Sequence, residues 1–376
     1  VAAASQDIAV DAYAVDVLKR EEQGVAVGAR IGLYRLAMFV SGGTAITLAD
    51  QFSWGWVCVG LALLFIPMML VTAFAPEPPV RFEEPKSLRE AIWNPFIGFL
   101  SRDRALEILA FVLLFKFADN FAQSLLRPFL VDMGYSAAER GIALSLVGLW
   151  TQIGGALLGG ILTNFLGLGR ALWLFGLLQV FSNVGYLYLA NTEHSTVAMV
   201  IAMGFETLCQ GLGTGAFSVL LLRMTQKRFS ATQYALFSTL FGMGRIFSGP
   251  VAGFTVDSVG WSWFFVASMV LGIPGLVMLH RFVPWGTREP EFEVREREPL
   301  PPLSRSQVVR IGVMFGAAAT LACAFLLAFL AALKNLRSED SVGFDLLAPL
   351  WSLVTPQGIV GWVQVIGLLA VGISLG

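Results

Sequence analysis

The sequence predicts an all-α polytopic membrane protein, and three observations support this fold class. Of the 376 residues, 56% are apolar and only 14% are charged, with a mean hydropathy of +0.72. Runs of about 20 apolar residues, enough to cross about 30 Å of hydrocarbon, recur along the chain. An internal repeat divides these runs into two similar sets, as in transporters built from two like halves.

The repeat consists of two apolar segments joined by a turn that carries an aspartate and two tryptophans. Each position recurs 207 residues later, so that 41 corresponds to 248. The matching positions are Ser41-Gly42, Asp50, Trp54, Trp56 and Pro67 in the first copy and Ser248-Gly249, Asp257, Trp261, Trp263 and Pro274 in the second.

Eleven segments have the length and hydropathy of membrane spans. They are residues 1–18, 24–49, 54–75, 105–131, 138–165, 169–190, 196–222, 231–256, 261–284, 308–333 and 357–376. The two copies of the repeat are six segments apart. If both copies are helices five and six of a half, three helices are expected ahead of the first segment, giving fourteen in the complete protein. A cleaved signal peptide would not explain half of a repeat.

These segments predict five regions. They are the last three helices of an N-terminal six-helix bundle (1–75), a proline-rich cytoplasmic linker (76–104), a C-terminal six-helix bundle (105–284), a charged cytoplasmic loop (285–307) and two additional spans (308–376). Lys and Arg collect in alternate loops, which places those loops in the cytoplasm. Trp93, Phe96, Phe99 and Leu100 would form a short amphipathic helix on that surface.

Nothing in the sequence indicates an enzyme, a cofactor, a metal site or a nucleic-acid partner. Cys58, Cys209 and Cys323 lie in separate apolar segments at no metal-ligand spacing. The HExxH, GxxxxGK[ST] and GxSxG patterns are absent from the sequence.

Polar residues at membrane depth are therefore the candidates for function. Lys116, Asp119, Asn120 and Gln123 share one face of a helix. Their alternative role is packing, through an ion pair between Lys116 and Asp119 within the helix.

Other polar positions extend this set of candidates. Asp7 lies near mid-membrane, with Gln6 beside it and Asp11 one turn nearer the cytoplasm. Glu206 and Gln210 share a face, as do Gln179, Asn183 and Tyr186, for which helix-to-helix hydrogen bonding is at least as good an explanation.

Two arginines, Arg35 and Arg245, lie far from both ends of their spans and require anions, whereas Arg30 is shallower. Glycines at GxxxG spacing, such as Gly155/Gly159 and Gly211/Gly215, indicate close packing of helices.

Several stretches of the chain form recognisable motifs: Ala4–Ile8, Tyr34-Arg35-Leu36 with Ser41-Gly42-Gly43, Lys116–Phe121, Ser182-Asn183, Glu206–Phe217 and Phe229–Gly253. Together they resemble one family, the AmpG-type muropeptide permeases of the major facilitator superfamily. The resemblance implies a monomeric fourteen-helix permease of the bacterial inner membrane. It would import N-acetylglucosaminyl-anhydromuramyl peptides by proton symport, for peptidoglycan recycling and β-lactamase induction. Residues from Gly159-Gly160 to Arg170 resemble a degenerate signature loop of the superfamily, with Asn164 where Asp is usual.

The expected partners are the muropeptide, protons and membrane lipid. The proton-coupling candidates are Asp7, Asp119 and Glu206. The substrate-binding candidates are Gln6, Asp11, Tyr34, Arg35, Lys116, Asn120, Gln123, Asn183, Gln210 and Arg245, with aromatic faces such as Phe121 and Trp150 available to sugar rings. Two alternatives stay open: a permease for acetyl-CoA, whose phosphates would require more cations, and a receptor or scaffold that does not transport.

Overall fold

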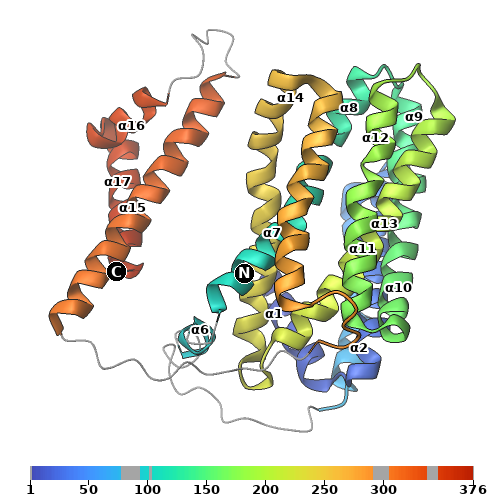
Figure 1. The fold of residues 1–376 in the computed structure, drawn as a ribbon, viewed down its shortest axis with the longest axis horizontal. Coiled ribbons are helices and arrows are strands. Elements are labelled where there is room, and N and C mark those ends of the chain that lie inside the picture. The colour runs from blue at the N-terminus through green and yellow to red at the C-terminus, as the bar shows by residue number, and fades with distance from the viewer. Residues whose placement is uncertain (1, 78–93, 101–103, 291–304, 337–345, 376) are drawn as a thin grey trace. The chain divides into compact units, whose positions relative to one another are not determined.

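The computed structural model describes residues 2–77, 94–100, 104–290, 305–336 and 346–375 (Figure 1). Within these ranges the regular structure is entirely helical. The chain divides into two compact units, residues 1–297 and residues 298–376. Trp93 and most of the predicted linker and charged loop lie outside the described residues.

The first unit contains helices α1 to α14. In order they are α1 (Ala2–Val17), α2 (Arg20–Phe39), α3 (Ala45–Ala49), α4 (Trp54–Leu63), α5 (Phe65–Ala73), α6 (Asn94–Leu100), α7 (Ala105–Ser124), α8 (Leu126–Asp132), α9 (Ala137–Gly141), α10 (Leu149–Leu166), α11 (Leu168–Ser182), α12 (Val184–Ala190), α13 (Thr196–Met224) and α14 (Ser230–Phe282). The second unit contains α15 (Arg305–Leu336), α16 (Leu347–Val354) and α17 (Gly358–Leu375).

Several predicted spans contain breaks that the hydropathy did not reveal. The predicted span 24–49 includes a π-helical segment, Val40–Thr44, between α2 and α3. The span 105–131 is interrupted at Leu125, just before α8. The span 169–190 is divided at Asn183, where α11 ends and α12 begins. The hydropathy pattern predicted spans without such breaks being visible, because mean hydropathy is insensitive to one irregular residue.

Seven helical stretches among the described residues are long and apolar enough to cross a membrane. They are Arg20–Ala49, Trp54–Ala73, Ala137–Leu166, Leu168–Ala190, Thr196–Met224, Lys227–Phe282 and Gly312–Phe329. The stretch Lys227–Phe282 contains two predicted spans, since Gly260 adopts φ 76° and the chain reverses there. The total of eleven spans therefore stays a prediction.

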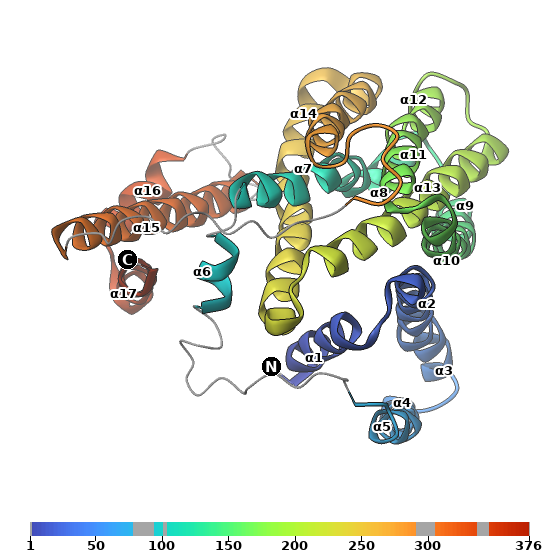
Figure 2. The ribbon, with the colours of Figure 1, turned by 60° about the horizontal axis from the view of Figure 1, so that its bottom comes forward.

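Both copies of the internal repeat form a helical hairpin. In the first copy the chain turns between α3 and α4, just before Trp54. In the second it turns at Gly260, and the two limbs of α14 lie side by side (Figures 1 and 2). The second turn is fixed by Trp261, whose Nε1 donates to Asp132 Oδ2 at 3.1 Å. A positive φ at Gly260 is accessible to glycine at little cost, which explains the residue type there.

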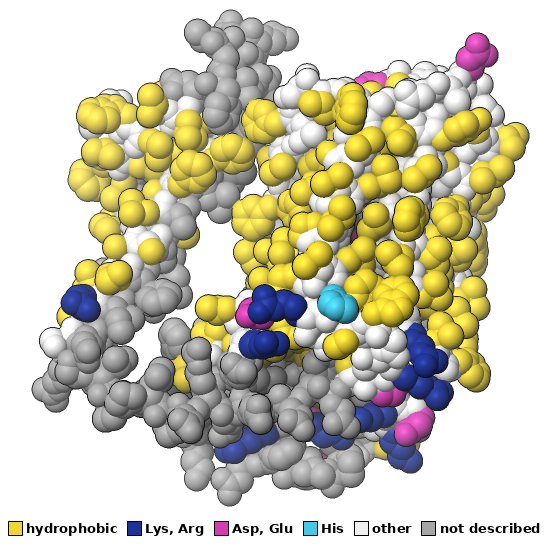
Figure 3. All heavy atoms as spheres, in the orientation of Figure 1, with side chains coloured by type: hydrophobic (Ala, Val, Ile, Leu, Met, Phe, Trp, Pro, Cys, Tyr) yellow, Lys and Arg dark blue, Asp and Glu magenta, His cyan; other side chains and the backbone are white. Residues whose placement is uncertain are grey.

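Packing in the first unit is organised around three pairs of helices: α7 lies along α14, and α10 lies between α13 and α2. Figure 3 shows apolar side chains along the sides of this unit and Lys and Arg gathered at one end. We call this end, which contains Arg170, Arg223, Arg281 and Arg288, the basic end. It is the end predicted to be cytoplasmic.

The contact between α2 and α10 depends on glycine. A Cβ atom added to Gly160 would lie 2.0 Å from the carbonyl oxygen of Gly24, and one added to Gly28 would lie 2.8 Å from the carbonyl oxygen of Ala156. Neither backbone oxygen can move without displacing its helix. The two helices can therefore approach this closely only without side chains at these positions.

We expect Gly160→Ala to destabilise the protein by about 1–3 kcal/mol, because the new methyl group would force α2 away from α10. Thermal unfolding of the purified protein in detergent measures this. Gly154→Ala is the matched control on the same helix, since a Cβ there meets nothing within 4 Å. It should leave stability unchanged or raise it by up to about 1 kcal/mol through helix propensity. Equal unfolding midpoints for the two variants would contradict the packing argument.

Candidate functional site

The middle of α7 carries a charged pair buried inside the first unit. Lys116 Nζ lies 2.9 Å from Asp119 Oδ2, and the lysine side chain is only 3% exposed. Lys116 also donates to Thr214 Oγ1 of α13 at 3.4 Å. The intrahelical ion pair considered from the sequence is therefore present, but it also reaches a second helix.

Asp119 accepts a second hydrogen bond on the same oxygen. Gln179 Nε2 of α11 donates to Asp119 Oδ2 at 2.6 Å. Space for the Gln179 amide is provided by Gly213, where an added Cβ would lie 2.4 Å from Gln179 Oε1. The glycine-rich segment of α13 thus makes room for a polar side chain from α11 as well as for the close approach of neighbouring helices.

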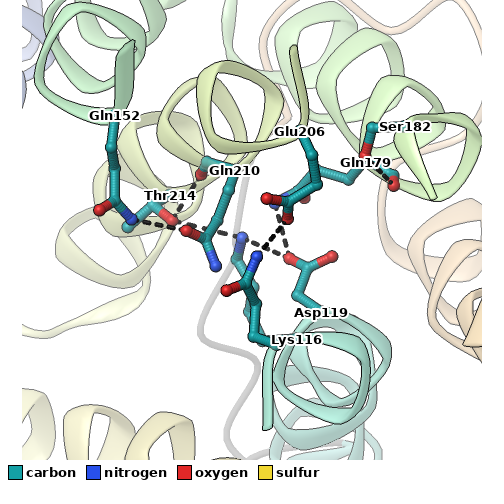
Figure 4. A network of polar contacts seen from close by, with 9 residues as sticks. Lys116, Asp119, Gln152, Gln179, Ser182, Glu206, Gln210 and Thr214 are labelled. Atoms are coloured by element: carbon teal, nitrogen blue, oxygen red, sulfur yellow. Dashed lines mark hydrogen bonds and ion pairs between the residues drawn. The ribbon is translucent and has the colours of Figure 1, made fainter. Parts of the chain in front are cut away.

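Glu206 of α13 is buried and is held by uncharged donors from two other helices. Gln123 Nε2 of α7 donates to Glu206 Oε1 at 2.6 Å, and the Tyr186 hydroxyl of α12 donates to Oε2 at 3.2 Å. Figure 4 shows Glu206 and Asp119 directed toward the same region between the helices. Each carboxylate oxygen of Glu206 thus has a neutral partner, whereas Asp119 has the lysine.

The set of contacts continues to α10 through amide and hydroxyl groups. Gln152 Nε2 donates to Gln210 Oε1 at 2.6 Å, and the Thr214 hydroxyl donates to the Gln210 carbonyl oxygen at 2.7 Å. The contacts form two hydrogen-bonded groups, one around Lys116 and one around Glu206, and we call them together the polar network; Figure 4 labels most of its members. It comprises Lys116, Asp119, Gln123, Gln152, Gln179, Tyr186, Glu206, Gln210 and Thr214, from helices α7, α10, α11, α12 and α13.

Aromatic side chains close the polar network on both sides along α7. On the side of the basic end, Phe115 stacks on Phe217 with ring centroids 5.1 Å apart. On the other side, Phe121 stacks on Phe264 at 4.8 Å. A small cavity adjoins Asp119 and Gln179, and its other lining residues are Phe115, Ala118, Gly176, Val180, Gly272 and Leu276. Apolar side chains thus flank the charged groups on both sides, and a low-polarity environment of this kind strengthens electrostatic interactions.

A second ion pair links α1 and α2. Arg30 pairs with Asp11, whose side chain is 10% exposed, and Arg30 also interacts with the Tyr234 side chain of α14. The sequence showed only that Arg30 is shallower than Arg35, and in the structure it is the partner of Asp11. Depth counted from the helix ends does not show where a neighbouring carboxylate lies.

The remaining predicted residues do not join the polar network. Gln6 and Asp7 are exposed on α1, and Tyr34 is 62% exposed on α2. Arg35 of α2 is half-buried and Arg245 of α14 is exposed. Their assignment to the substrate stays a prediction.

Two predicted asparagines lie next to the network. The Asn120 backbone oxygen accepts from Ser248 Oγ at 3.1 Å, which joins α7 to α14. Asn183 is buried and its Oδ1 has no hydrogen-bond partner among the described residues. An unsatisfied amide oxygen of this kind is costly unless a water or ligand atom binds it.

Two members of the network, Gln152 and Thr214, were missed from the sequence. Thr214 follows Gln210 by one helical turn, so the polar face that begins at Glu206 contained a signal for it. Gln152 has no such neighbour within α10. It could be found only from the close contact of α10 with α13, where a Cβ added to Gly155 would lie 2.4 Å from the Leu208 oxygen.

The long apolar helices, with charged side chains buried between them, define a polytopic α-helical membrane protein. The chain belongs to the major facilitator superfamily, which it matches over residues 1–247 and 194–376. The resemblance noted from the sequence is thereby confirmed, as is the all-α membrane fold.

Two relatives are informative. The chain is 44% identical over 278 residues to the anhydromuropeptide permease of Escherichia coli (strain K12), which covers 73% of this chain and 57% of that protein. It is 33% identical over 293 residues to an uncharacterized protein of Haemophilus influenzae, covering 75% of this chain and 69% of the relative. The chain thus spans little more than half the length of the E. coli permease.

Proposed function

We propose that this protein is a secondary active transporter that imports N-acetylglucosaminyl-anhydromuramyl peptides from the periplasm to the cytoplasm together with protons. The observation that carries this proposal is the polar network at membrane depth in a chain 44% identical to an anhydromuropeptide permease. Buried charges in a membrane are costly and are retained where ions or substrates pass. In a bacterial inner membrane, such import would serve peptidoglycan recycling and β-lactamase induction.

Two groups of cations support a substrate that carries carboxylates. Lys116 has one hydrogen-bonded carboxylate, Asp119, and could exchange it for a substrate carboxylate. Among the described residues, neither Arg35 nor Arg245 forms an ion pair with a carboxylate, and each guanidinium could bind a substrate carboxylate. The amides of Asn120, Gln123, Asn183 and Gln210 offer donors and acceptors for sugar hydroxyls. Asp11, paired with Arg30, would fix α1 against α2 rather than bind substrate.

The coupling proton is proposed to bind Glu206. With Lys116 and Asp119 paired, an ionised Glu206 leaves the polar network with an uncompensated negative charge, because its partners Gln123 and Tyr186 are neutral. Protonation of Glu206 would neutralise the network and permit its rearrangement. Asp119 is the second candidate, and Asp7, exposed on α1, is the third.

We further propose that residues 1–75 belong to one half of the transporter and residues 105–284 to the other, connected by the linker 76–104. The similar hairpins of the two repeat copies support this division. Monomeric function is part of the proposal, because a permease of this fold encloses its substrate within one chain.

Uptake measurements test the proposed function. Membrane vesicles that contain the full-length protein should accumulate labelled N-acetylglucosaminyl-anhydromuramyl peptide when the outside is acidified. A protonophore should abolish this accumulation. Vesicles without the protein are the control. Accumulation of acetyl-CoA instead, or no binding of either compound, would contradict the proposal in favour of the other permease or of a scaffold.

A further inference from the structure

The segment after α14 crosses the basic end of the first unit instead of leaving it. We call residues 283–290 the strap. Trp173 Nε1 of α11 donates to the Val283 carbonyl oxygen at 2.8 Å, and the Gly169 amide donates to the Arg288 oxygen at 2.9 Å. The strap is therefore fixed at both of its ends to the start of α11.

Glycines at the junction of α10 and α11 form the surface on which the strap lies. A Cβ added to Gly169 would lie 2.2 Å from the Thr287 oxygen, and one added to Gly167 would lie 2.5 Å from the Arg288 oxygen. Gly167 also has φ +85°, a conformation that favours glycine. Both residues lie in the stretch that resembles a degenerate signature loop. In this structure that stretch binds the backbone of the strap.

The strap places Glu289 between two helix termini. Glu289 Oε1 accepts from the Leu168 amide at 3.3 Å, and its other carboxylate oxygen pairs with Arg223 at the end of α13. The Arg223 side chain is only 10% exposed. A side chain with this many donors is thereby held in one orientation.

Arg223 reaches the other side of the bundle. Its Nε donates to Gln23 Oε1 of α2 at 3.1 Å, and Gln23 is buried. Next to this contact, Asn164 Nδ2 of α10 donates to the Glu21 backbone oxygen at 2.6 Å. The first contact joins α2 to α13 and the second joins α2 to α10. Both lie at the basic end, beside the contact of Gly24 with Gly160.

Farther along α2 from the basic end, the contact with α10 is looser. A Cβ added to Gly32 would lie 3.4 Å from the Ile153 side chain, whereas one added to Gly24 would lie 2.2 Å from the Gly160 oxygen. Beyond Gly32, Met38 is 51% exposed. The closest approach of α2 to α10 therefore lies at the basic end.

We propose that Glu289 is a positioning residue that holds Arg223 against Gln23, so that the strap keeps the basic end of the bundle closed. This inference rests on the proposed function, in which α2 and α13 belong to different halves and substrate leaves at this end. Release then requires Arg223 to part from Gln23, while Glu289 retains Arg223 on its own half. The strap thereby sets the stability of the closed state without touching substrate.

Distances between spin labels test this without any transport assay. With the three native cysteines replaced by serine, labels at Glu21→Cys and Arg170→Cys report the separation of α2 from α11, since both positions are exposed. Pulsed EPR should give one short distance for the parent protein. Glu289→Gln should add a second, longer population, and Gln23→Leu should do the same by removing the acceptor on α2.

Rescue and control variants separate positioning from folding. Glu289→Asp should restore the short distance, whereas Glu193→Gln, an exposed acid in the α12–α13 loop, should not alter it. Unchanged thermal midpoints should accompany the new distance. The inference is overturned if Glu289→Gln and Gln23→Leu both keep the parent distance, whatever the uptake assay shows. If the spin-label distances are as expected but muropeptide is not taken up, the proposed substrate is wrong and the positioning role of Glu289 is still supported.

Discussion

Replacing Lys116 with methionine is expected to lower muropeptide uptake at least thirtyfold. The change keeps the length of the side chain but removes the buried charge that Asp119 and Thr214 contact. Loss of one partner from a buried, hydrogen-bonded charge pair costs about 2–5 kcal/mol, and the lower figure corresponds to about thirtyfold. Initial rates of uptake of labelled anhydromuropeptide, normalised to protein in the membrane, measure the effect.

The same variant should also be less stable, by about 3 kcal/mol, because Asp119 would remain in the network with Gln179 as its only donor. The double variant Lys116→Met/Asp119→Asn removes both charges. It should recover most of the stability without recovering uptake, which separates binding from folding. Recovery of uptake in the double variant would show that Lys116 serves packing alone, as the simpler interpretation of the sequence holds.

The sequence was sufficient to predict the class of fold, because hydropathy and the 207-residue repeat are properties of the chain itself. It also predicted the polar face of α7, since Lys116, Asp119 and Gln123 lie one or two turns apart on the same helix. Periodicity within one helix is enough to define a shared face, because side chains three, four or seven residues apart point in similar directions.

Partners on different helices could not be predicted in this way. The contact of Gln179 with Asp119 depends on Gly213, which makes room for the amide, and a glycine in a sequence does not state what fills the space beside it. Arg30 and Asp11 illustrate the same limit, because the ion pair is determined by how α1 lies against α2. Pairing between helices requires three-dimensional packing.

The strap shows a further limit of sequence reasoning. Residues 285–307 were predicted as a charged loop, a description that composition supports. Both ends of the strap are held to α11 through the backbone carbonyl groups of Val283 and Arg288, and these groups carry no information about residue type. The recognisable signal was on the other side of the contact, in the glycines of the α10–α11 loop.

Glu206→Gln is expected to separate substrate movement from the proton gradient. Glutamine has nearly the same shape: its Oε1 can still accept from Gln123 and its Nε2 can donate to the Tyr186 hydroxyl oxygen, but it cannot gain or lose a proton. With one proton per substrate, a gradient of about one pH unit supplies about 1.4 kcal/mol, which is a tenfold accumulation. The variant should therefore show an accumulation ratio near one under that gradient.

Exchange of labelled for unlabelled substrate without a gradient should persist in Glu206→Gln, since the neutral side chain imitates the protonated carboxyl group. Asp119→Asn provides the contrast: it leaves Lys116 without its carboxylate partner and should impair exchange as well. Asp7→Asn, on the exposed face of α1, should retain the tenfold ratio. If instead Glu206→Gln still accumulates substrate in response to the pH gradient, the proton must bind elsewhere. Loss of accumulation in only one of the other two variants would then identify Asp119 or Asp7 as the carrier.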